Sequence, residues 1–230
     1  MTIARLRLIV AIGLALPASQ TPVRGQNSFA DDIRKTKPPA RVQPQVTAPT
    51  NGVAASGKPA APDAPAAANP RFAKFALIEA KDFGVAPTNR LRGDPMHAPT
   101  PTRIEGGLVI TTEALHALYE SKPGSFIVFD VLGGQQRLPN AQNALPASRA
   151  GSFSDATQRE FANYLQKATG NRKDLPLVFY CQSVYCWMSY NAALRAINLG
   201  YTKVFWYRGG IEAWQQVNLP THPAESSGGR

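Results

Sequence analysis

The sequence predicts an α/β fold in which an open parallel sheet carries helices on both faces. The short apolar runs SFIVFDVL and LPLVFY lack polar alternation, as expected for strands that are buried on both faces of a parallel sheet. Segments with apolar residues at helical spacing lie between such runs. Strands that alternate with helices along a chain form parallel sheets through right-handed crossovers.

The predicted elements follow one another from residue 108. Thr111 or Thr112 is expected to cap the first helix, and Gly170 is expected to end the second. Ligands of such sheets bind at the carboxyl ends of the strands. In chain order, we expect a strand and a helix within 108–121, a strand at 125–132, a helix at 154–170, a strand at 175–180, a helix at 187–199, a strand at 203–207 and a helix at 209–217.

Residues 1–25 are typical of a signal peptide. Arg5 and Arg7 precede the apolar run LIVAIGLAL at 8–16, and small residues follow before residue 25. The run is far shorter than the ~20 residues needed to cross a bilayer. We therefore expect cleavage and a periplasmic or secreted product with no transmembrane segment in the mature chain. The alternative is an uncleaved anchor.

The next two segments differ in composition from the domain that follows them. Residues 26–70 are rich in Pro, Ala, Gln and Lys, with Phe29 as their one aromatic residue, which predicts a disordered spacer. Residues 71–105 are more apolar and contain the proline-rich stretch DPMHAPTPT. We expect them to form an N-terminal arm that packs on a domain at 106–225.

The chain is basic, with a formal net charge of +10. A nucleic-acid-binding protein would gather Lys and Arg on one face with interleaved aromatic residues, whereas here they are scattered. We therefore expect no nucleic-acid partner. The charge is interpreted as a source of solubility and of attraction for anionic substrates or partners.

The chain contains two cysteines, Cys181 and Cys186. Cys181 is predicted to follow a central strand and to precede a helix that Ser189 caps. The backbone N–H groups of residues 182–188 are then expected to converge on its sulfur. This geometry would stabilise a thiolate, because a helix amino terminus lowers the pKa of a cysteine. The same donors would hold a persulfide or an anionic sulfur donor.

Three segments resemble the rhodanese superfamily. VFYCQSVYCWMSYNAALRA is similar to its active-site strand, loop and helix, and LGYTKVFWYRGGIEAWQQVNLP is similar to its closing segment. FIVFDV resembles the earlier strand that ends in Asp. The resemblance covers roughly the last hundred residues. It implies a rhodanese-like domain at 106–225 in which Cys181 carries the reactive thiol.

A narrower resemblance concerns the second cysteine. The Cys-Trp-Met-Ser pattern, with DFGVAPT and MHAPTPT in the arm, is similar to rhodanese-like proteins named for a CXXCW motif. That group is associated with PQQ-dependent alcohol oxidation in the periplasm, which implies a setting for this chain. The chain departs from the rhodanese pattern, since Leu132 stands where Arg is usual and the cysteine spacing is C-x4-C-W.

Four interpretations of the cysteine pair differ in their chemistry. In the first, Cys181 is the nucleophile and Cys186 is a resolving thiol that discharges a persulfide or sulfenate. In the second, the two residues form a static disulfide. In the third, they bind copper, zinc or a haem, with His97 or His222 as a further ligand. The fourth is a C-x5-R phosphatase, which Trp187 at the Arg position excludes.

Several residues are expected to line the substrate site. Arg208 follows a strand at its carboxyl end and is the candidate for attracting an anionic substrate. Asp130 is expected either to orient a substrate or to brace a loop. Trp187 is expected to face the site, while Trp206 is assigned to the core. The full predicted set is Gln182, Ser183, Val184, Tyr185, Trp187, Met188, Arg208 and Asp130.

We therefore expect a periplasmic protein that carries out sulfur transfer or thiol–disulfide chemistry through Cys181, with Cys186 as the partner thiol. The substrate is expected to be a small sulfur-containing or thiol compound, or a periplasmic protein partner. No cofactor and no metal are expected. The alternative is a non-catalytic binding module for a periplasmic partner or redox cofactor, with a structural Cys181–Cys186 disulfide.

Overall fold

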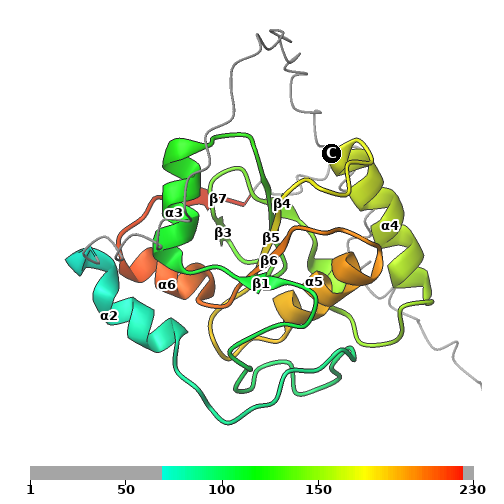
Figure 1. Cartoon of the computed structure of the whole chain (residues 1–230), viewed down its shortest axis with the longest axis horizontal. Coiled ribbons are helices and arrows are strands. Elements are labelled where there is room, and N and C mark those ends of the chain that lie inside the picture. The colour runs from blue at the N-terminus through cyan, green and yellow to red at the C-terminus, as the bar shows by residue number, and fades with distance from the viewer. Residues whose placement is uncertain (1–68, 225–230) are drawn as a thin grey trace, which may run out of the picture.

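The computed structural model describes residues 69–224, so the predicted signal peptide and all but the last two residues of the predicted linker lie outside it. Five parallel strands form the main sheet in the order β1–β6–β5–β2–β4 (Figure 1). The strands of this sheet are β1 (Leu108–Val109), β2 (Ile127–Asp130), β4 (Gln142–Asn143), β5 (Leu177–Tyr180) and β6 (Val204–Tyr207).

Helices cover both faces of this sheet, which confirms the predicted fold class. Figure 1 shows α4 and α5 on one side of the strands and α3 and α6 on the other. None of the helices in residues 69–224 is long and apolar enough to cross a membrane. The helices are α2 (Pro70–Glu79), α3 (Thr112–Ser121), the short 3-10 helix η1 (Leu145–Ser148), α4 (Ala156–Thr169), α5 (Met188–Asn198) and α6 (Gly210–Gln216).

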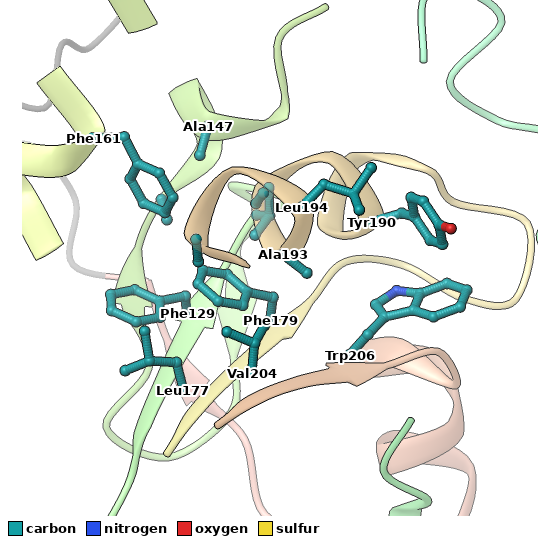
Figure 2. Packing of buried hydrophobic residues seen from close by; sticks show 14 of the residues in the cluster. Phe129, Ala147, Phe161, Leu177, Phe179, Tyr190, Ala193, Leu194, Val204 and Trp206 are labelled. Atoms are coloured by element: carbon teal, nitrogen blue, oxygen red, sulfur yellow. The ribbon is translucent and has the colours of Figure 1, made fainter. Parts of the chain in front are cut away.

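The continuous apolar runs of the central strands supply two separate cores. Side chains alternate across a strand, so Phe129 and Phe179 join the core on the α4 and α5 side, where their rings stack at 5.0 Å (Figure 2). Val128 and Val178 join the core on the α3 and α6 side. The runs lack polar alternation because both faces of each strand are buried.

Helix termini explain where the longer helices begin and end. Thr111 caps α3, since its side chain accepts a hydrogen bond from the Ala114 N–H, and Gly170 ends α4 in the left-handed conformation, both as predicted. Asp155 caps α4 by accepting from the Gln158 N–H.

Some elements were not predicted from the sequence. They are α2 within the arm, the 3-10 helix η1, strand β4, and an antiparallel pair formed by β3 (Gln136–Arg137) and β7 (His222–Pro223). Each of these three strands has two residues, which is too short for a periodic pattern to reveal.

Candidate functional site

The candidate site lies at the carboxyl end of β5, the middle strand of the sheet. Residues 181–187, hereafter the cysteine loop, connect β5 to α5. The amino end of α6 packs on this loop, because the Ile211 and Glu212 N–H groups donate to the carbonyl oxygens of Cys181 and Gln182, each at 3.0 Å. Cys181, the first residue after β5, is therefore fixed by the strand that precedes it and by its hydrogen bond to α6.

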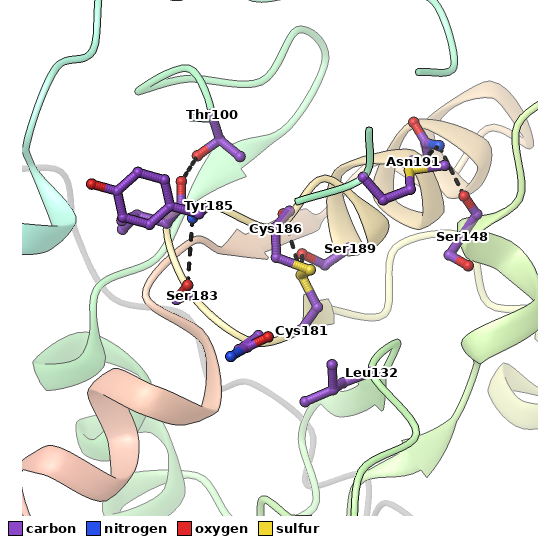
Figure 3. Close-up of a disulfide and its surroundings, with 12 residues drawn as sticks. Thr100, Leu132, Ser148, Cys181, Ser183, Tyr185, Cys186, Ser189 and Asn191 are labelled. Atoms are coloured by element: carbon purple, nitrogen blue, oxygen red, sulfur yellow. Dashed lines mark hydrogen bonds between the residues drawn. A yellow bond between two sulfur atoms is a disulfide. The ribbon is translucent and has the colours of Figure 1, made fainter. Parts of the chain in front are cut away.

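Cys181 and Cys186 form a disulfide (Figure 3), with their Cα atoms 6.3 Å apart. Both residues are buried, each with 1% of its surface exposed. A disulfide between them is the product that the resolving-thiol interpretation requires, and it is also the link that the static interpretation requires. The structure thus joins the two residues that the sequence singled out.

The prediction that the loop amides converge on the reactive sulfur is wrong for three of them. The Cys186 N–H donates to the Ser183 carbonyl oxygen at 3.0 Å, and the Trp187 N–H donates to the Met96 carbonyl oxygen at 2.9 Å. The Tyr185 N–H points to the Ser183 hydroxyl at 3.5 Å. These three N–H groups bond to acceptors in the loop and in the neighbouring arm, so they do not surround the sulfur as an anion-binding site.

Ser189 contacts the cysteine sulfur instead of capping α5, so that prediction was also wrong. The helix begins at Met188, and its N-cap Trp187 makes no side-chain capping bond. The Ser189 Oγ lies 3.0 Å from the Cys181 Sγ and accepts a hydrogen bond of 3.0 Å from the Trp206 Nε1–H. The sequence signal that could have revealed the inward position of Ser189 is Trp206, because the indole N–H of a tryptophan in a buried strand needs an acceptor nearby.

The arm lies along the outer side of the cysteine loop and pairs with it in antiparallel fashion. His97 and Cys186 form an isolated β-bridge, and the Ala98 N–H donates to the Tyr185 carbonyl oxygen at 2.8 Å. Main-chain pairing of this kind covers the loop segment that carries the second cysteine. Residues far upstream in the chain therefore contribute to the burial of the disulfide.

Trp187 does not face an open site, contrary to the prediction. It is 1% exposed, and its Nε1–H donates to the Pro99 carbonyl oxygen at 3.0 Å. The Arg92 guanidinium lies over its ring at 4.5 Å, and the Tyr190 ring meets it edge-on at 5.0 Å. The indole is buried because the arm supplies both an acceptor and a cation for it.

Arg208 is not presented to substrate either. It is 1% exposed, and its Nε donates to the Thr100 Oγ1 at 3.0 Å while its Nη2 donates to the carbonyl oxygens of Lys81 and Thr100 at 2.9 and 3.0 Å. Its Nη1 donates to the Glu79 carbonyl oxygen. The guanidinium therefore fastens the arm to the end of β6, which corrects the prediction that it attracts an anion.

Asp130 braces the loop that follows β2, the second of its two predicted roles. Its Oδ1 accepts from the N–H groups of Leu132 and Gly133 at 2.8 and 3.1 Å, and its Oδ2 pairs with the Arg137 Nε at 3.2 Å. Burial raises the pKa of this carboxyl, although the two amides and the Arg137 charge act in the opposite direction.

Comparison with known families decides what this fold is. Residues 117–217 match the family model for the rhodanese-like domain. The chain contains a rhodanese-like domain. The matched span includes the cysteine loop, α5, β6 and α6. No curated protein matches the chain.

Solved structures similar to this rhodanese-like domain come from several bacteria. The BH2092 protein of Bacillus halodurans is 20% identical over 50% of this chain and 77% of its own, with a TM-score of 0.38. A rhodanese-like domain from Anabaena sp. is 14% identical over 53% and 86%, with a TM-score of 0.37. A Rhodopseudomonas palustris protein of unknown function, described as a possible tyrosine phosphatase, is 19% identical over 50% and 84%, also with a TM-score of 0.37.

The other predicted substrate residues of the rhodanese-like domain have diverse surroundings. Tyr185 is 45% exposed and its ring lies 4.9 Å from that of Phe83. Gln182 is exposed and donates from its side chain to Glu212, whereas Val184 is buried. A shallow hollow beside them is lined by Phe75, Ile78, Ser183, Val184, Tyr185, Gly209, Glu212, Ala213 and Gln216. Met188 packs against the core on the α5 side.

The metal interpretation named His97 or His222 as a further ligand. His97 lies opposite Cys186 in the arm, and His222 pairs with Arg137 in the β3–β7 ribbon. Within residues 69–224, no three His, Cys, Asp or Glu residues lie together as potential ligands of a metal ion.

Proposed function

We propose that the rhodanese-like domain couples sulfur transfer to thiol–disulfide chemistry, with Cys181 as the nucleophile and Cys186 as the resolving thiol. The observation that carries the proposal is the bond between these two residues at the carboxyl end of β5. This is the edge at which sheets of this class bind ligands. A persulfide formed on Cys181 would have its resolving thiol within bonding distance.

The proposed cycle has two steps from the reduced enzyme. The Cys181 thiolate attacks the outer sulfur of a sulfane donor such as thiosulfate, whose S–S bond breaks so that sulfite leaves with the electron pair. The Cys186 thiolate then attacks the Cys181 Sγ, which forms the disulfide and releases the terminal sulfur as hydrosulfide. The transferred sulfur gains two electrons and the thiol pair loses two. A dithiol of the compartment would reduce the disulfide and be oxidised in turn.

The proposed setting is the periplasm, as the predicted signal peptide suggests. There a disulfide is the expected state of a cysteine pair that is not actively reduced. The resemblance to the CXXCW group supports a role accessory to PQQ-dependent alcohol oxidation. The partner in that setting is either a small sulfur compound or a periplasmic protein that reduces the domain.

The test uses the reduced protein, freed of reductant and mixed with thiosulfate under nitrogen. Sulfite, hydrosulfide and the intact mass are followed together. We expect the mass to rise by about 32 Da and then to fall to about 2 Da below that of the reduced chain, as a persulfide forms and is resolved. Hydrosulfide should appear with the second change.

Two variants separate the steps. Cys186→Ser should retain the persulfide and release sulfite without hydrosulfide. Cys181→Ser should release neither product. Absence of sulfite from the wild-type protein, with this donor and with a persulfide donor, would overturn the proposal.

A second candidate function is a non-catalytic binding module with a structural disulfide. The observation in its favour is the burial of both cysteines, together with the use of the Arg208 guanidinium inside the protein. This candidate predicts that the oxidised chain binds its partner and that both single cysteine variants bind it normally when folded. Reduction of the wild-type disulfide would then leave the affinity unchanged.

A further inference from the structure

Ser189 connects the cysteine sulfur to the core of the sheet. Its Oγ lies 3.0 Å from the Cys181 Sγ and 3.0 Å from the Trp206 Nε1, and Figure 3 shows it beside the disulfide. Ser189 and Trp206 are 1% and 0% exposed. Water therefore has little opportunity to replace either contact.

The direction of these hydrogen bonds follows from the donor inventory. An indole N–H is only a donor, so the Ser189 Oγ accepts from Trp206. The serine hydroxyl has one proton, and the Cys181 Sγ of the disulfide has none. Ser189 must therefore be the donor to Cys181.

The contact distinguishes the two cysteines. In the part of the chain that the structure describes, the Cys181 Sγ lies within hydrogen-bond distance of a side-chain hydroxyl, and no such contact is recorded for the Cys186 Sγ. A hydroxyl that donates to sulfur stabilises a thiolate more than a neutral thiol, because hydrogen bonds to charged acceptors are stronger. Trp206 fixes the rotamer that aims this donor.

We propose that Ser189, oriented by Trp206, is the positioning residue that makes Cys181 rather than Cys186 the thiolate nucleophile of the reduced domain. The inference deepens the proposed function and rests on it for its chemical meaning. Upon reduction, the serine proton that faces the disulfide would face the Cys181 thiolate. The oriented hydroxyl would thus take the part that the loop amides were expected to play.

Charged groups on three surrounding elements bind partners other than the Cys181 sulfur. Arg208 at the end of β6 binds the arm, Asp130 at the end of β2 binds its own loop, and Glu212 of α6 binds the Gln182 side chain. His97 of the arm lies opposite Cys186 through its backbone. The Ser189 hydroxyl is the polar side-chain group that contacts the Cys181 sulfur, and the backbone carbonyl oxygen of Cys186 lies 3.2 Å from the same sulfur.

The test measures the thiolate directly, in the Cys186→Ala background, so that Cys181 is the single cysteine and no second hydroxyl takes the place of its disulfide partner. The rate of alkylation by iodoacetamide is followed against pH, without any sulfur donor. Adding Ser189→Ala should raise the pKa of Cys181 by about 1 to 2 pH units, the range expected for losing a hydrogen bond to a charged group. Ser189→Thr, which keeps the hydroxyl, should restore most of the lower value.

Ser148→Ala is the matched control, because Ser148 is another buried serine whose hydroxyl donates to a carbonyl oxygen, that of Leu145. It should leave the pKa of Cys181 unchanged while removing a comparable buried hydrogen bond. If Ser189→Ala does not fold, Trp206→Phe removes the orienting donor and should raise the pKa in the same direction. Folding of each variant is checked by circular dichroism.

Two results would overturn the inference. One is an unchanged pH profile in folded Ser189→Ala, and the other is an equal change in Ser148→Ala. Because no sulfur donor is used, an unchanged profile with normal sulfite release from thiosulfate would remove the role of Ser189 and leave the proposed function standing. A raised pKa of Cys181 in Ser189→Ala, together with no sulfite release by the wild type, would support the role of Ser189 and overturn the proposed function.

Discussion

The hydroxyl of Thr100 donates a hydrogen bond of 2.6 Å to the carbonyl oxygen of Val184 in the cysteine loop. The same Oγ1 accepts from the Arg208 Nε at 3.0 Å, and the Thr100 N–H also reaches the Val184 carbonyl at 3.2 Å. Thr100 is fully buried. One threonine of the arm thus links the cysteine loop to the end of β6.

Thr100→Val should lower the free energy of unfolding by about 1–3 kcal/mol, because a methyl group in place of the hydroxyl leaves the buried Arg208 Nε–H without its acceptor. We also expect faster reduction of the Cys181–Cys186 disulfide by dithiothreitol, since the arm would hold the loop less tightly. Urea denaturation and timed alkylation measure the two effects. Thr102→Val is the control, because Thr102 is exposed. Equal behaviour of the two variants would show that the link does not restrain the loop.

Reduction of the disulfide should destabilise the domain by a moderate amount. The two cysteines are five residues apart, so the closed loop is short and the chain-entropy model gives about 2 kcal/mol. Urea denaturation with and without reductant measures this difference. The double variant Cys181→Ser and Cys186→Ser should show no response to reductant. A response in that variant would place the effect outside the disulfide.

Gly210→Ala should disrupt the contact between α6 and the cysteine loop. Gly210 has a φ of +65°, and a Cβ at this position would lie against the carbonyl oxygens of Cys181 and Gln182. Gly200 has a φ of +82° with no atom within 4 Å of its added Cβ, so Gly200→Ala has the backbone strain without the clash. We expect a loss of about 1–2 kcal/mol for Gly200→Ala. Gly210→Ala should lose about 1–3 kcal/mol more, from the overpacking. Equal losses in urea denaturation would contradict the packing argument.

Acid should weaken the domain through Asp155. Burial raises the pKa of this carboxyl, but hydrogen bonds from Arg195 and from the amides of Gln158 and Ser152 outweigh it, so the pKa in the folded chain is below its ordinary value. The folded chain therefore binds this proton more weakly than the unfolded chain. The stabilisation is present above the unfolded pKa of about 4 and is lost as the pH falls through the folded value.

Asp155→Asn should accordingly be less stable than the wild type at pH 7, with a difference that shrinks towards pH 3. Urea denaturation across this range measures it. Asp174→Asn is the control, because Asp174 is exposed. A difference between wild type and Asp155→Asn that stays constant with pH would show that the charge of Asp155 is not what Arg195 recognises.

Much of the fold could be predicted because its signals are local. The apolar runs around Phe129 and Phe179 mark strands whose two faces are both buried, and Gly170 marks a helix end through its own backbone conformation. The two-residue strands β3, β4 and β7 and the helix of the arm could not be predicted in this way. Their residues are ordered by contacts with distant parts of the chain.

The site was predicted unevenly, for the same reason. Cys181 and Cys186 were identified from their place after a strand and from their spacing, both of which are properties of the sequence. Arg208 and Trp187 were misassigned because their position in the loop and strand pattern says nothing about the arm that covers them. Ser189 was misassigned because a helix start allows a serine either to cap or to face inward.

The sequence by itself determined the parallel α/β architecture and the cysteine pair at the carboxyl end of the middle strand. Only the tertiary structure decided which groups surround that pair: an arm in place of open solvent, and one serine hydroxyl on the Cys181 sulfur in place of several loop amides. The physical reason is that strand and helix patterns depend on neighbouring residues. The partners of a buried donor or sulfur depend on segments about a hundred residues away, such as Pro99 for Trp187 at a separation of 88.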